Sequence, residues 1–90
     1  MTSITGKYCV YIVLCQDGTY YTGYTNDLER RLKLHNSGKG AKYTRGRGPV
    51  RLVYKRGCNS LSKALKTEIE IKSLTREEKE KLVNTKKRSV

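Results

Sequence analysis

Five residues in this chain have side chains that together could cleave a phosphodiester bond: Tyr11, Tyr21, Arg31, His35 and Glu68. Such a reaction needs an activated water, stabilisation of the negative charge that develops on the phosphate, and help for the leaving oxygen. A tyrosine can orient or deprotonate water, an arginine can grip phosphate through its planar fork, and a carboxylate can hold a hard cation such as Mg²⁺ or Mn²⁺. The set contains a candidate for each task.

Each member also has an ordinary structural interpretation. A tyrosine in a strand is usually a core or edge aromatic, and a histidine at a helix end often compensates the helix dipole. Arg31 could be a surface residue, and Glu68 could be a buried acid paired with Arg31 or with a tyrosine hydroxyl. A phenolate also requires positive charge nearby, because the ordinary pKa of tyrosine is about 10. Which tyrosine would act as the base stays open.

The two tyrosines lie on candidate strands. Residues Lys7–Cys15 are β-branched, aromatic or small, and Thr19–Tyr24 follows an Asp-Gly turn signal, so a hairpin is predicted. Val50–Lys55 has strand character again and predicts a third antiparallel strand. Between helix and strand, residues 37–49 hold four glycines and four basic residues, which is typical of a loop.

The length of the hairpin loop decides whether the tyrosines can act together. A two-residue turn at Asp17-Gly18 would place Tyr11 and Tyr21 on opposite faces of the sheet. A three-residue loop with Gly18 left-handed would make them diagonal neighbours on one face and set Tyr11 opposite Gly23, with open space beside it. We expect the second register because the chemistry requires it.

A first helix is predicted from a capping pair, Asn26 and Glu29, to about His35 or Asn36. Leu28 and Leu32 mark its inward face. Because they are four residues apart, Arg31 and His35 share one side at the flank of that face.

A second helix should begin after Ser60 or Ser62 and reach about Leu74. On a helical wheel Glu68 lies near the centre of an apolar face and Glu70 on the opposite side; that face comprises Leu61, Ala64, Leu65, Ile69 and Ile71. A carboxylate aimed at a core is costly unless it is paired or bound to metal. A capping box at residues 75–78 predicts a third helix through Leu82 or Val83, with a frayed basic tail after it.

Charge is concentrated in one part of the sequence. The net charge is +12, and the segment from Arg30 to Thr67 holds twelve Lys or Arg and no Asp or Glu. Such a field favours polyanions, above all nucleic acid, although a merely basic soluble protein would look alike. Three cysteines without paired spacing indicate a reducing cytoplasm, and no run is apolar enough to span a membrane.

In order and spacing, these residues resemble a GIY-YIG nuclease domain of the small stand-alone bacterial kind. The first motif corresponds to Cys9-Val10-Tyr11 and the second to Tyr21-Thr22-Gly23, followed by Arg31, His35 and Glu68. Cys9 replaces the first glycine, and the family's C-terminal Asn has only Asn84 as a counterpart.

The resemblance implies an α+β fold in ββαβαα order, with a three-stranded antiparallel sheet flanked by about three helices. It further implies one domain over residues 1–90, with its core at about 7–84, and a metal-dependent endonuclease acting on DNA, perhaps structured or damaged DNA. Glu68 would hold a single Mg²⁺ or Mn²⁺ ion, without an organic cofactor. Basic and aromatic residues would follow the nucleic acid: Lys39, Lys42, Tyr43, Arg45, Arg47 and Arg51. One alternative stays open, a non-catalytic nucleic-acid-binding module; in either case a partner protein or an unusual substrate would have to confer specificity.

Overall fold

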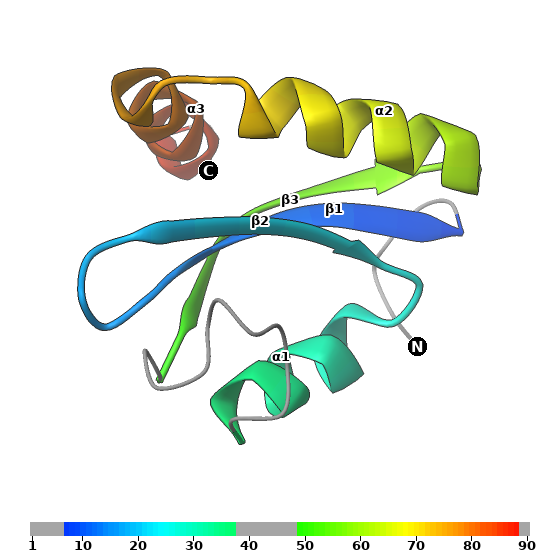
Figure 1. The fold of residues 1–90 in the computed structure, drawn as a ribbon, viewed down its shortest axis with the longest axis horizontal. Coiled ribbons are helices and arrows are strands. Elements are labelled where there is room, and N and C mark those ends of the chain that lie inside the picture. Colours follow the sequence, from blue (N-terminus) through cyan, green and yellow to red (C-terminus); the bar gives the residue numbers. More distant parts are fainter. Residues whose placement is uncertain (1–6, 38–48, 89–90) are drawn as a thin grey trace.

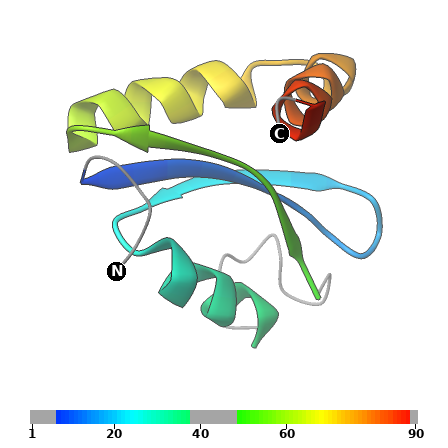
Figure 2. The ribbon, with the colours of Figure 1, turned by 180° about the vertical axis from the view of Figure 1, so that it is seen from behind.

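The computed structural model describes residues 7–37 and 49–88 of the chain. It has the α+β architecture that the sequence predicts, a three-stranded antiparallel sheet with helices on both faces. The strands are β1 (Tyr8–Leu14), β2 (Tyr20–Thr25) and β3 (Arg51–Cys58), in the spatial order β2-β1-β3. The helices are α1 (Leu28–Asn36), α2 (Leu61–Lys72) and α3 (Arg76–Arg88). Helix α1 covers one face of the sheet, and α2 and α3 cover the other (Figures 1 and 2).

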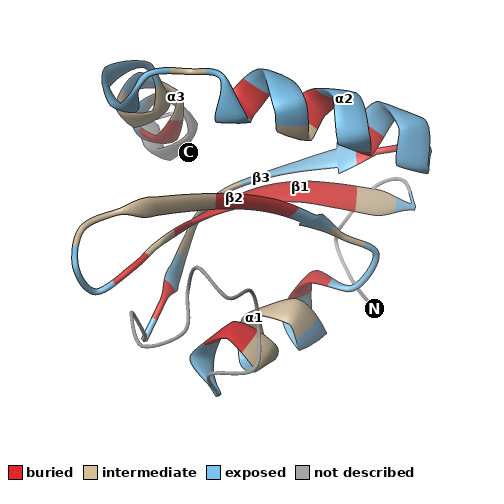
Figure 3. Cartoon of the chain, in the orientation of Figure 1, coloured by how far each residue is buried: buried red, intermediate tan, exposed pale blue. Residues whose placement is uncertain are grey.

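The central strand β1 has a buried side chain on nearly every residue because helices pack on both of its faces (Figure 3). On the α1 side a cluster is built from Cys9, Tyr11, Val13, Cys15, Leu28 and Val50. On the α2 side a second cluster contains Val10, Ile12, Cys58, Ala64, Ile71 and Val83. Alternation along β1 therefore divides the core into two thin layers and assigns Tyr11 to the α1 side.

The hairpin has the three-residue loop, so the predicted register is confirmed. Cys15 donates its backbone N–H to the carbonyl of Thr19 at 2.8 Å, and Gly18 has a φ of +88°. Val13 lies opposite Tyr21, and Tyr11 lies opposite Gly23. The side chains of Tyr11 and Tyr21 consequently share the α1 face of the sheet.

Capping residues fix the helix starts, with one correction. The N-cap of α1 is Asp27 and not Asn26, because the Asp27 carboxylate accepts the N–H of Arg30 at 3.2 Å. Ser60 caps α2. The predicted capping box is present at α3, where the backbone N–H of Thr75 donates to Glu78 at 2.9 Å and the N–H of Glu78 donates to the Thr75 hydroxyl.

Other boundaries differ by a few residues. Strand β3 continues to Cys58, three residues beyond the prediction, and α2 ends at Lys72 with Ser73 as its C-cap. Helix α3 reaches Arg88, although the sequence predicted an end at Leu82 or Val83. Within the described part of the chain, no helix has the length and apolar character to cross a membrane.

The predicted apolar face of α2 is wrong in part. The buried residues are Ala64, Thr67 and Ile71, whereas Ile69 is 66% exposed. Leu61 and Leu65 are exposed too. The helix thus rests on a narrower stripe than the wheel indicated, rotated away from Glu68, which lies at the flank of the contact with the sheet and not at its centre.

Candidate active site

Tyr11 is the centre of a hydrogen-bonded cluster formed by β1 and α1. Its hydroxyl oxygen lies 2.9 Å from Nε2 of His35, and Nε of Arg31 donates to the same oxygen at 3.3 Å. Because the oxygen accepts from Arg31, its proton is available for Nε2 of His35. His35 would then carry its own ring proton on Nδ1. Two of the residues predicted from the sequence, Arg31 and His35, therefore form hydrogen bonds with the hydroxyl of a third, Tyr11.

Tyr21 borders this cluster from β2. The ring centroids of Tyr21 and His35 are 5.4 Å apart, and those of Tyr21 and Tyr11 are 6.5 Å apart. Its side chain is partly exposed, while Tyr11 is fully buried and His35 is 1% exposed. Tyr21 accordingly lies on the solvent side of the cluster, and Tyr11 and His35 lie beneath it.

Gly23 makes this packing possible. A Cβ atom at Gly23 would lie 2.7 Å from the Tyr11 hydroxyl oxygen and 3.1 Å from Cε2 of Tyr21. The open space expected from the sequence is thus filled by the two tyrosine rings. The glycine is required at this position because the Tyr11 ring crosses directly over the neighbouring strand.

Burial determines the protonation states in the cluster. Burial raises the pKa of Tyr11 above its ordinary value of 10.0, despite the opposing effect of the Arg31 hydrogen bond and charge. Burial, followed by repulsion from Arg31, lowers the pKa of His35 below 6.5. At neutral pH Tyr11 is therefore a phenol and His35 a neutral imidazole. Arg31 does favour the phenolate, but burial has the larger effect on the pKa of Tyr11.

Glu68 approaches the cluster from α2, on the other face of the sheet. Its side chain is 15% exposed and pairs with Lys72 at 3.4 Å. Its charge is close enough to contribute, after burial and the repulsion from Tyr21, to the raised pKa of Tyr11. Lys72 was not among the residues predicted from the sequence, although the spacing of four residues on a helix is a recognisable signal for such a pair.

Glu68 is the one predicted metal ligand. The described residues include no group of three or more His, Cys, Asp or Glu side chains that could enclose a metal ion. A single carboxylate suits Mg²⁺ or Mn²⁺, which keep several waters and take further oxygens from a phosphate. Lys72 is 52% exposed and can move aside, so the carboxylate is compatible with such an ion.

The expected nucleic-acid contacts fall mostly outside the described residues, namely Lys39, Lys42, Tyr43, Arg45 and Arg47. Arg51 is described and exposed at the start of β3. This strand forms the sheet edge opposite β2, so Arg51 is separated from Tyr21 by the width of the sheet.

The sequence matches a known protein family. Residues 7–81 match the model of the GIY-YIG catalytic domain. The chain is 57% identical over 77 residues to UPF0213 protein BH0048 of Halalkalibacterium halodurans, covering 86% of this chain and 82% of that protein. The names of this and similar relatives state no activity.

Two solved structures share the fold. The solution NMR structure of UPF0213 protein BH0048 is 56% identical with a TM-score of 0.58, covering 88% of this chain and 84% of that one. The solution NMR structure of EF2693 from E. faecalis is 43% identical with a TM-score of 0.63, covering 93% and 90%. Both similarities extend over nearly the whole chain.

Proposed function

Because the chain belongs to the GIY-YIG catalytic domain family, we propose that it is a metal-dependent endonuclease that hydrolyses phosphodiester bonds in DNA. The observation that carries this proposal is the three-residue cluster in which Tyr11 bonds both Arg31 and His35. A buried tyrosine hydroxyl needs a hydrogen-bond partner, but here both an arginine and a histidine bond the same hydroxyl. The cluster brings together a guanidinium group that can bind phosphate and a pair of groups that can donate and accept a proton, as phosphodiester hydrolysis requires.

Arg31 has the position to bind the scissile phosphate. Its Nε is engaged by Tyr11, which fixes the guanidinium plane, and its side chain is partly exposed. The remaining N–H groups of the fork can donate to phosphate oxygens. Arg30, its neighbour, is exposed, and its backbone N–H donates to the cap residue Asp27.

Proton transfer is assigned to the pair of Tyr11 and His35. The phenol can pass its proton to Nε2 of His35 across 2.9 Å as it accepts one from water, so a free phenolate need not form. Because its pKa is lowered, His35 is neutral at pH 7 and can accept a proton. Tyr21, which is partly exposed, would orient the water or the phosphate at the mouth of the site.

Glu68 would hold the cation in place of Lys72. When bound, Mg²⁺ or Mn²⁺ supplies positive charge that stabilises the transition state and the leaving oxygen. Glu68 on α2 would supply one carboxylate ligand, and Arg31 on α1 would bind the phosphate. The two halves of the proposed site are thus contributed by helices on opposite faces of the sheet.

The test is cleavage of labelled DNA, single-stranded, duplex and branched, by purified protein with Mg²⁺ or Mn²⁺. We expect cleavage by wild type and a loss of about a hundredfold or more in Glu68→Gln and Arg31→Lys. Matched controls are Glu70→Gln and Arg30→Lys, which change exposed neighbours on the same helices and should cleave like wild type.

Two outcomes would contradict the proposal. One is the absence of cleavage by folded wild type with any of the DNAs and either cation. The other is equal cleavage by Glu68→Gln from a clean preparation. Salt-dependent DNA binding without turnover, unchanged in both site variants, would instead identify a non-catalytic binding module.

A further inference from the structure

Strand β3 forms the edge of the sheet farthest from the candidate active site. The order β2-β1-β3 places Tyr21 and Gly23 on one outer strand and β3 on the other. Within the described parts of the chain, β3 pairs with β1 and no further strand lies beyond it. At eight residues it is also the longest strand. A long outer strand of this kind is a template for the addition of another extended segment.

The hairpin fixes which backbone groups of β3 face outward. Since Cys15 and Thr19 are hydrogen-bonded, the odd-numbered residues of β1 bond to β2 and the even-numbered ones bond to β3. Tyr54 and Arg56, which pair with even-numbered residues, therefore direct their backbone groups inward. Leu52 and Gly57, which pair with Val13 and Cys9, direct theirs to the outer edge.

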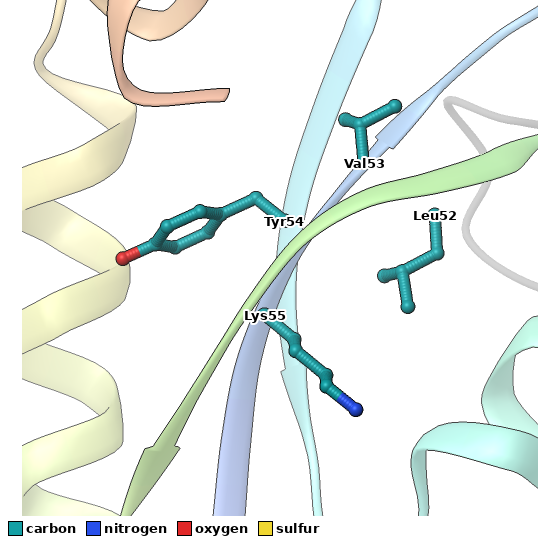
Figure 4. A pocket seen from close by; sticks show the side chains of 4 residues that line it. All are labelled: Leu52, Val53, Tyr54 and Lys55. Carbon is teal, nitrogen blue, oxygen red and sulfur yellow. The ribbon is translucent and has the colours of Figure 1, made fainter. Parts of the chain in front are cut away.

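A pocket of about 200 Å³ lies along the same stretch, lined by Leu52, Val53, Tyr54 and Lys55. Figure 4 shows the Tyr54 ring directed toward α2, with Leu52 and Lys55 on the other side of the strand. The register shift opposite Ile12 and Val13 makes Val53 the extra residue and bends the strand here. The pocket is large enough for an apolar side chain of an added strand.

The charge of β3 indicates which kind of molecule could bind along its outer edge. Strand β3 carries Arg51, Lys55 and Arg56 and no acidic residue. A second copy pairing through the same edge would bring these charges against themselves, which disfavours it. A nucleic acid backbone would offer acceptors for the outward N–H groups but no donors for the outward carbonyls. An extended polypeptide satisfies both, and acidic side chains in it would match the arginines.

We propose that the outer edge of β3 is a docking site for an extended acidic segment of a partner protein, which joins the sheet as a fourth strand. The apolar side chains of that segment would enter the pocket at Leu52–Lys55, and its carboxylates would meet Arg56 and Arg51. Docking there leaves the β2 edge, with Tyr21 and Arg31, open to substrate. The partner could in this way direct the protein to its substrate without covering the site. This docking does not depend on catalysis.

The probe is a capped peptide of about eight residues that alternates glutamate and valine, matched to the length of β3. Amide hydrogen exchange is followed by NMR on the full chain. We expect exchange at the outward amides of Leu52 and Gly57 to slow by about tenfold or more at saturating peptide. The inward amides of Tyr54 and Arg56 are already protected and should change little. The same peptide N-methylated at every residue, which has no backbone N–H left to donate, should not bind.

Charge reversal provides a second, independent measurement. Arg56→Glu should weaken peptide binding by roughly five- to tenfold, because an attraction becomes a repulsion. Lys63→Glu, an equal change at an exposed position of α2, should leave binding within about twofold. Unchanged exchange at Leu52 and Gly57, equal binding of the N-methylated peptide, or equal protection by a DNA oligonucleotide would each overturn the proposal.

Discussion

Substitution of Gly23 by alanine tests the packing of the site most directly. The added Cβ would lie 2.7 Å from the Tyr11 hydroxyl oxygen, 3.0 Å from its Cζ and 3.1 Å from Cε2 of Tyr21. Tyr11 is fully buried and held by Arg31 and His35, so its ring has no room to withdraw. We expect the hydroxyl to shift and its hydrogen bond to His35 to lengthen.

The size of the effect follows from two opposing terms. Forcing one methyl group into a filled core destabilises by about 1–3 kcal/mol. Replacing glycine by alanine in a strand returns about 0.5–1 kcal/mol through the unfolded chain. The net loss lies between about 0 and 2.5 kcal/mol, and its midpoint of about 1.25 kcal/mol lowers the Tm of a chain of this size by roughly 5–10 °C. Cleavage should fall by about a hundredfold, because misplacement by about 1 Å is enough for that.

Thermal unfolding by circular dichroism and cleavage of labelled DNA measure the two quantities. Gly18→Ala is the matched control: its φ of +88° makes alanine strained by about 1–2 kcal/mol, but no atom lies within 4 Å of the added Cβ. It should lose similar stability and keep wild-type cleavage below its Tm. If Gly23→Ala unfolded and cleaved like wild type, the described contact between Gly23 and Tyr11 would be refuted.

Two further predictions concern buried polar groups. The Thr22 hydroxyl is the one buried side-chain polar atom in the described residues without a hydrogen-bond partner, so Thr22→Val should raise the free energy of unfolding by about 1 kcal/mol in urea titrations. The Thr67 hydroxyl accepts a hydrogen bond from Cys58 Sγ, so Thr67→Val should not raise the free energy of unfolding. Equal effects of the two substitutions would contradict the explanation from the unpaired Thr22 hydroxyl. The pKa of His35 lies below its ordinary 6.5, so the unfolded chain binds the proton first and stability should fall as pH drops through about 6.5. His35→Gln should flatten this pH dependence, and an unaltered profile would show that His35 is not its source.

Local patterns were sufficient for the fold but not for the alignment of the tyrosines. Strand alternation, the Asp-Gly turn and the Thr75–Glu78 capping box are interactions between near neighbours, so their residue types predict them. The three-residue loop was chosen on chemical grounds, and the bond from Cys15 to Thr19 confirms it. Asp27 replaced Asn26 as the cap because either residue type can cap, and only the path of the chain out of β2 decides between them.

Tertiary packing decided what the sequence could not. The wheel placed Glu68 among apolar residues, but β2 and β1 contact the Ala64, Thr67 and Ile71 side of α2 and leave Ile69 exposed. Hydrophobicity alone cannot predict which part of a broad apolar stripe meets the sheet. The raised pKa of Tyr11 likewise depends on its complete burial, which α1 produces by covering β1. Both features arise where distant elements meet.

The division of the candidate site between two helices also bears on local unfolding. The hydrogen bonds of Tyr11 to Arg31 and His35 span 20 and 24 positions of the chain. Glu68 lies much later in the sequence, on α2, which follows β3. Only the docking of α2 on its narrow stripe holds that carboxylate near the cluster. We expect α2 to open at a lower free energy than the hairpin and α1. If the proposed function holds, a chain in that partly open state would keep Arg31 in place to bind phosphate but lose the proposed metal ligand Glu68, so it would bind DNA without cutting it.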